Sequence, residues 1–196
     1  MSTLASLYEQ AEQKEKAEQI FLRALSIFQS LKPAEFSSYS LTDVVEELAT
    51  FYLNWQKPEQ AQPVLQQYLA QPDKLGDYNN ARLSNLLGWT YLAQNRLMLA
   101  NDAFEKASTY WNQSDAQSLP LSYLLDLAYI SLRNGNIYVL KQHVEDIKPY
   151  GYIDGYTSYL QNQIAQTASA NQPNLRFTVK RWMAHLEVLQ YVLSEQ

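Results

Sequence analysis

One residue pattern that occurs four times in the same register constrains this chain most. Each copy begins its pattern with a small residue, and these are Ala5, Ala49, Gly88 and Ala128, separated by 44, 39 and 40 residues. Self-similarity at a period of roughly 20–50 residues is typical of chains built by stacking copies of one structural unit. The sequence therefore predicts a repeat protein, in which each unit packs mainly on its neighbours.

Each copy has the apolar spacing of two helices joined by a short turn, and no strand pattern is present. The second copy keeps Tyr52, Ala61 and Leu65, whereas the fourth is weaker and has Ser131 in place of the tyrosine. The first and third copies agree at five positions, pairing Ala5 with Gly88, Tyr8 with Tyr91, Ala17 with Ala100, Phe21 with Phe104 and Ala24 with Ala107.

Gly88 lies in the middle of an apolar helical stripe, where glycine costs roughly 1 kcal/mol of helix stability relative to alanine. We interpret the small residue at this position of every copy as the point where the second helix of a unit crosses the first. Closer packing of the two backbones would offset the lost helix propensity.

The stretch "LGWTY" at 87–91, followed by "ANDAF" at 100–104, resembles the tetratricopeptide repeat (TPR) family. The segment "LASLYEQAEQKEKAEQIFLRALSIF" is similar to the longer-spaced, kinesin-light-chain-like form of this repeat. The resemblance covers about Met1 to Pro149. It implies an all-α fold, a right-handed superhelical solenoid of stacked antiparallel helix pairs with about ten helices.

We expect one domain over residues 1–196. Its last helix carries an apolar seam, which we interpret as a cap that closes the end of the solenoid. The alternative is a dimerisation seam that would make the chain a homodimer. The seam comprises Leu175, Val179, Trp182, Leu186, Leu189 and Leu193. The expected repeats cover about 1–32, 42–75, 81–114 and 121–150, and a degenerate helix pair covers about 152–196.

Composition argues against several classes of function. A net charge of −5 does not favour nucleic-acid binding, and without cysteine there is no thiolate nucleophile or cysteine metal site. His143 and His185 lie on different expected helices, so we expect no metal site. We also expect no cofactor and no enzymatic activity. Arg176, Lys180 and Arg181 are expected to form a solvent-exposed basic cluster.

No apolar run reaches the roughly 18 residues of a membrane-spanning helix, so we expect a soluble chain without membrane insertion. We expect a cytoplasmic location, although an upstream signal or anchor could be absent from this sequence. A small polar N-terminal segment enters a helical pattern almost at once, which is typical of a piece of a longer protein.

The resemblance implies a concave groove that binds a peptide or a helix of a partner protein. We expect Trp89 and Tyr129 to supply most of the binding energy, since exposed aromatic residues often do so at interfaces. The alternative is that neighbouring helices cover Trp89. A second functional class is a sensor or assembly module of a larger regulatory protein. The expected partner-binding residues are Glu46, Asn54, Arg82, Asn85, Trp89, Leu92, Leu125, Tyr129 and Arg133.

Overall fold

The computed structural model describes residues 2–30, 38–114, 120–170 and 172–194. These residues form ten α-helices and no strand, which confirms the expected all-α class and the number of helices. No helix in the described ranges is long and apolar enough to cross a membrane. The α-helices are α1 (Ser2–Gln10), α2 (Lys14–Ser30), α3 (Ser38–Asn54), α4 (Pro58–Leu69), α5 (Asp77–Ala93), α6 (Leu97–Gln113), α7 (Leu121–Arg133), α8 (Ile137–Ile147), α9 (Ile153–Ala170) and α10 (Arg176–Ser194), with short 3-10 turns η2 (Pro72–Lys74), η3 (Lys148–Tyr150) and η4 (Pro173–Leu175).

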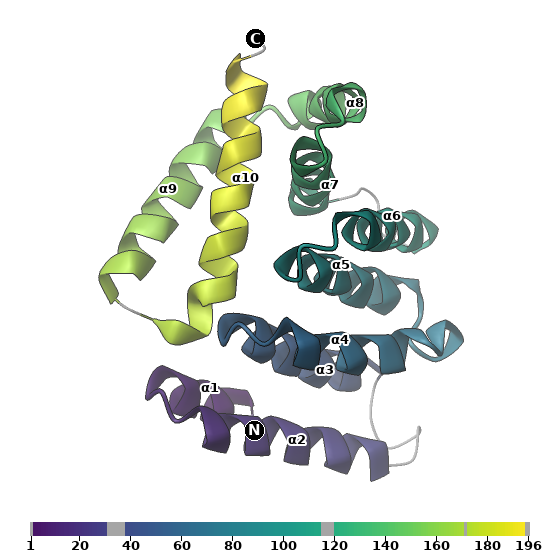
Figure 1. Cartoon of the computed structure of the whole chain (residues 1–196), viewed down its shortest axis with the longest axis vertical. Helices are drawn as coiled ribbons and strands as arrows, with labels where there is room; N and C mark the ends of the chain where they lie inside the picture. Colours follow the sequence, from purple (N-terminus) through teal and green to yellow (C-terminus); the bar gives the residue numbers. More distant parts are fainter. Residues whose placement is uncertain (1, 31–37, 115–119, 171, 195–196) are drawn as a thin grey trace.

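The first eight helices pack as four consecutive pairs, and each pair also packs on the next (Figure 1). The first and fourth pairs fall within the expected repeats, whereas α3 and α5 each begin four residues before the expected start of their repeat. The last pair is arranged differently, because α10 runs across the ends of the earlier helices. It packs on α9, α7 and α3, while η4 packs on α1 and α3. The C-terminal helix therefore reaches back to the first unit.

The turn inside each pair has the same backbone geometry. One residue adopts a left-handed conformation, and the next residue donates its N–H to the carbonyl five positions earlier, as Lys57 does to Tyr52 at 2.8 Å. This is the Schellman ending of a helix, which satisfies carbonyls that the helix leaves free. The left-handed residues are Glu12, Gln56, Asn95 and Gly135, each seven positions after the small residue of its copy.

The expected helix crossing at Gly88 is confirmed. A Cβ atom built on Gly88 would lie 2.6 Å from Cδ1 of Phe104, on the second helix of the same pair. Phe104 is itself buried and makes an edge contact with the Trp89 ring at 6.0 Å between centroids. Glycine at this position therefore makes room for a ring that the surrounding core holds in place.

Helix α10 buries a face that differs from the expected seam. Its most buried side chains are Ala184, His185, Val188, Leu189 and Val192, and of these only Leu189 belongs to the seam. The other seam residues of α10 are partly exposed. The reason is that α10 has α9 on one side and the earlier helices on another, so it needs two contact faces.

Candidate binding groove

The expected partner-binding residues lie along the side of the molecule that α10 crosses, and they divide into two regions. We call the region formed by α1, α2 and α3 the open half, since it contains a cavity. We call the region formed by α5 and α7 beneath α10 the covered half. The two halves are made from equivalent positions of the repeats.

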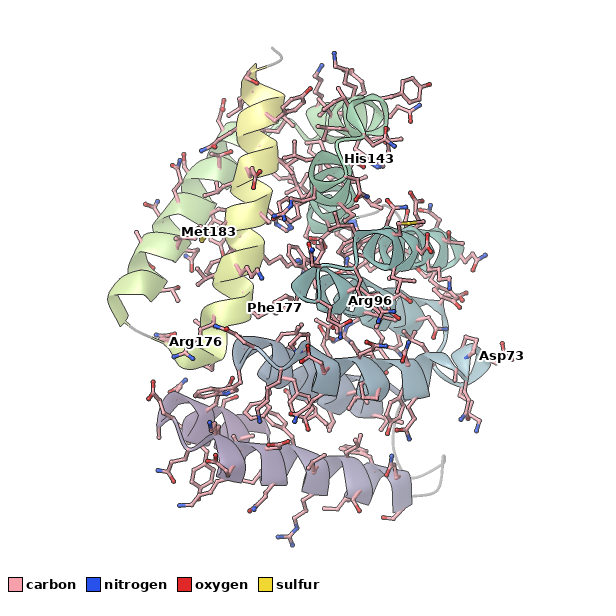
Figure 2. The ribbon with its side chains drawn as sticks, viewed as in Figure 1. Asp73, Arg96, His143, Arg176, Phe177 and Met183 are labelled. Atoms are coloured by element: carbon pink, nitrogen blue, oxygen red, sulfur yellow. The ribbon has the colours of Figure 1, made fainter. Side chains whose placement is uncertain are left out.

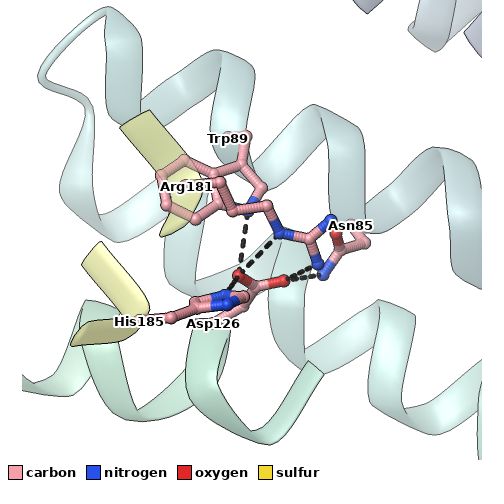
Figure 3. Close-up of polar contacts among 5 residues, drawn as sticks. All are labelled: Asn85, Trp89, Asp126, Arg181 and His185. Carbon is pink, nitrogen blue, oxygen red and sulfur yellow. Dashed lines mark hydrogen bonds and ion pairs between the residues drawn. The ribbon is translucent and has the colours of Figure 1, made fainter. Parts of the chain in front are cut away.

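Asp126 is the centre of the covered half (Figure 3). Its carboxylate is fully buried on α7 and accepts hydrogen bonds from Nδ2 of Asn85 at 2.8 Å and Nε1 of Trp89 at 3.1 Å, both on α5. From α10, Arg181 donates through Nε at 3.1 Å and Nη2 at 2.5 Å, and Nε2 of His185 lies 2.7 Å from Oδ1. One carboxylate therefore connects three helices.

The charges in this cluster are balanced. Burial by itself would raise the pKa of Asp126, but the neighbouring Arg181 and His185 outweigh that effect and lower the pKa, so the carboxylate is ionised. Burial lowers the pKa of His185 more than Asp126 raises it. Neutral His185 must then donate from Nε2 to the carboxylate, which leaves Nδ1 buried and without a hydrogen-bond partner among the described residues.

Asn54, at the end of α3, holds the start of α10. Its Oδ1 accepts the backbone N–H of Phe177 at 2.7 Å, which is one of the amides that the first turn of a helix leaves unpaired. Its Nδ2 donates to the carbonyl of Asn174 at 2.8 Å and to Oε1 of Glu9 at 2.9 Å. The asparagine therefore caps α10 from a residue 123 positions earlier.

Aromatic side chains close the covered half. The ring of Trp89 stacks on Tyr129 with centroids 5.8 Å apart and meets the edge of Phe177 at 5.8 Å. Phe177 projects from the first turn of α10 toward α5 (Figure 2). Trp89 is only 3% exposed, so the expectation of an exposed ring is wrong, and the alternative that neighbouring helices cover it is correct.

The remaining expected residues of this half have different surroundings. Leu125 is fully buried in the same apolar cluster as Val188 and Leu189. Leu92 is partly buried next to the Trp89 cluster. Arg133 is exposed and donates to the Tyr129 hydroxyl at 3.2 Å. Leu125 is therefore a core residue in this structure, whereas Arg133 lies at the surface.

The open half contains a cavity of about 850 Å³, bounded at one end by η4 and the first turn of α10. Arg82 extends from α5 to form ion pairs with Asp43, at 2.9 Å, and with Glu46. Burial raises the pKa of Glu46 even though Arg82 opposes that shift. Glu9 and Glu47 also line the cavity, so its carboxylates outnumber its single arginine.

Asp126 is not among the residues expected to bind a partner, and the expected position of Arg181 is wrong. Arg181 was expected in a solvent-exposed basic cluster, but its guanidinium is mostly buried against Asp126. The available signal was a single carboxylate in the apolar stretch 121–132, together with Arg181 and His185 one helical turn apart on α10. Among the described residues, no group of three or more acidic or histidine side chains is placed to hold a metal ion.

No protein-family model and no curated protein matches this chain.

Proposed function

We propose that the chain is a non-catalytic protein–protein interaction scaffold of the tetratricopeptide-repeat type. In this proposal the four helix pairs form a right-handed solenoid, and its concave groove binds a peptide or a helix of a partner. The observation that carries the proposal is that the groove holds a helix, α10, through side chains of three different pairs, namely Asn54, Trp89 and Asp126. An amphipathic helix lying in a groove is a recurring mode of protein recognition.

The cavity of the open half also supports this proposal. Its volume of about 850 Å³ falls within the range of ligand pockets, roughly 300–1,000 Å³. Asp43, Glu46, Glu47 and Glu9 face it, against Arg82 alone. Charge complementarity favours a partner segment that carries lysine or arginine, because these carboxylates attract positive side chains and repel negative ones.

The experiment uses three purified chains, namely the wild type, Glu47→Lys and Asp73→Lys, to capture partner proteins from a cell lysate of the source organism. Glu47 lines the cavity, whereas Asp73 is exposed in η2, far from α10 (Figure 2). We expect Glu47→Lys to lose proteins that the wild type and Asp73→Lys both retain, with equal melting temperatures for all three chains. Identical sets of retained proteins would contradict the proposal.

A second candidate is an assembly module in which the C-terminal helices mediate dimerisation or contact with another domain. Tyr159 on α9 and Met183 on α10 favour it, because these large side chains of the C-terminal pair are 50% and 59% exposed and could be covered by a second chain. Sedimentation equilibrium of the wild type and of Met183→Glu tests it. A wild-type dimer that the variant abolishes would support this candidate, and a wild-type monomer would contradict the homodimer.

A further inference from the structure

The contact between α10 and the groove has the composition of an interface between two proteins. The helix pairs contribute Asn54, Trp89 and Asp126, and α10 contributes Phe177, Arg181 and His185. A buried ion pair of this kind adds little net stability compared with apolar side chains of the same size. Aromatic residues and arginine with paired polar groups are instead typical of protein–protein interfaces.

The polar groups of this contact are also imperfectly matched. Nδ1 of His185 and Oδ1 of Asn174 are buried and have no hydrogen-bond partner in the part of the chain that the structure describes. A buried polar atom without a partner loses its hydration and gains nothing in return. His185 on α10 is therefore not completely satisfied by the covered half, and Asn174 in η4 is not completely satisfied beside the open half.

The groove recognises three side chains of α10 that share one face. Phe177, Arg181 and His185 follow one another at intervals of four residues, so they lie in a row along the helix. Phe177 packs against the Trp89 ring at 75° between the ring planes, and the other two residues bind Asp126. Any helix with an aromatic residue, an arginine and a neutral hydrogen-bond donor at this spacing offers the same groups.

We propose that α10 is an internal occupant of the covered half, and that a partner helix carrying the pattern aromatic-x3-Arg-x3-donor replaces it. This inference rests on the proposed function as a scaffold, and it names the partner of the half that is closed in this structure. Helix α9 packs on α10, so the two move away together as a hairpin connected to the repeats through η3.

The first test measures whether α10 opens while the rest of the chain stays folded. The chain contains no cysteine, so a single introduced thiol reports its own exposure. Ala184→Cys places the thiol on the buried face of α10, and Ala103→Cys is the matched control on α6, since both alanines are 4% exposed. The readout is the rate of reaction with a disulfide reagent under native conditions.

We expect the thiol at position 184 to react at least tenfold faster than the thiol at position 103, because opening of the hairpin exposes only the former. Equal rates would mean that α10 separates only when the whole chain unfolds, and would overturn the proposal. Circular dichroism of both variants establishes that each is folded before the rates are compared.

The second test adds a synthetic peptide copying residues 172–194 to the full-length Ala184→Cys chain. A peptide that displaces α10 should raise the thiol reaction rate in a saturable way, and the same peptide with Arg181→Ala should not. No increase, or an equal increase with both peptides, would overturn the proposed pattern. A stable dimer at the working concentration would instead identify the α10 of a second copy as the occupant.

The two proposals fail in different ways. Retention of the same lysate proteins by wild type and Glu47→Lys contradicts the proposed function at the open half, and it leaves the thiol rates unaffected. A thiol at position 184 that reacts no faster than the thiol at position 103 contradicts the exchange of α10. That result does not bear on partner binding in the open half.

Discussion

The two halves of the groove use equivalent positions of the repeat, yet one is open and the other is covered. The position directly after the small residue of each copy is Ser6 and Thr50 in the open half, and Trp89 and Tyr129 in the covered half. The short polar side chains leave a cavity of about 850 Å³. The large rings project far enough to contact Phe177 on α10, directly or through each other. The size of one side chain per helix pair therefore distinguishes the open half from the covered half.

The acidic residues of the two halves also differ, because the one in the covered half is buried and the one in the open half is partly exposed. Asp126 is fully buried, and all of its partners lie on α5 and α10. Asp43, by contrast, is partly exposed at the edge of the cavity, and its partner Arg82 lies on α5 of the next helix pair. An ion pair that water can reach contributes little to stability, whereas a buried one becomes costly when one partner is lost. Matched substitutions in the two halves should therefore differ in their effect on the free energy of unfolding.

The largest effect is expected for Trp89→Ala, compared with Thr50→Ala at the equivalent position of the open half. Removal of the buried tryptophan should lower the free energy of unfolding by about 3–5 kcal/mol, since it deletes contacts with Tyr129, Phe104 and Phe177. Thr50→Ala should change it by less than about 0.5 kcal/mol. Urea denaturation measures both, and similar values for the two variants would show that α10 does not cover Trp89 in solution.

The second comparison pairs Asp126→Asn with Asp43→Asn. The first removes the charge that compensates a mostly buried Arg181, and should cost about 3 kcal/mol of unfolding free energy. The second weakens an ion pair at the rim of the cavity, and should cost less than about 1 kcal/mol. A rim variant that is as destabilising as the buried one would refute the distinction between the halves.

Gly88→Ala is expected to have a smaller effect, because it adds only one methyl group. That group would meet Phe104 at 2.6 Å, and overpacking of a core typically costs about 1–3 kcal/mol, which exceeds or offsets a gain of roughly 1 kcal/mol in helix propensity. The matched change in the open half is Ala49→Gly, which creates no clash and should cost roughly 1 kcal/mol through helix propensity. If Gly88→Ala proved stabilising, Phe104 would have room to move and the crossing would be less tight than it is here.

The smallest effect concerns pH. Because burial lowers the pKa of His185, the unfolded chain binds its proton first, and stability should fall as the pH decreases below about 6.5. The slope from one histidine cannot exceed about 1.4 kcal/mol per pH unit. The lowered pKa of Asp126 adds a loss only below about pH 4, whereas the raised pKa values of Glu9 and Glu46 act in the opposite direction.

The variants His185→Gln and His143→Gln separate these contributions. Burial also lowers the pKa of His143, but that residue lies on α8 away from α10 and is only half-buried. Thermal melts between pH 5 and pH 7 should therefore show a flatter dependence for His185→Gln than for His143→Gln. The reverse order would indicate that His185 is solvated and that α10 is already displaced.

Local pattern was enough to predict much of the helical part of this protein. The register of small residues predicts four pairs of helices, each joined by a short turn, and it predicts the close crossing of two helices at Gly88. The same register placed Asn54, Asn85 and Trp89 on the side that α10 crosses. These features are predictable because they depend on residues within one repeat, where spacing along the helix fixes which side chains meet.

Only the tertiary structure decided where α10 lies. Its contacts join Arg181 to Asp126 and Phe177 to Asn54, over separations of 55 and 123 residues. A hydrophobic stripe indicates that a helix has a buried face, but it does not say which surface covers that face. The expected seam shares only Leu189 with the most buried side chains of α10, and the polar row of Arg181 and His185 forms a second contact side. Whether Trp89 is exposed or buried depended on that second side, because the groove and its occupant come from distant parts of the chain.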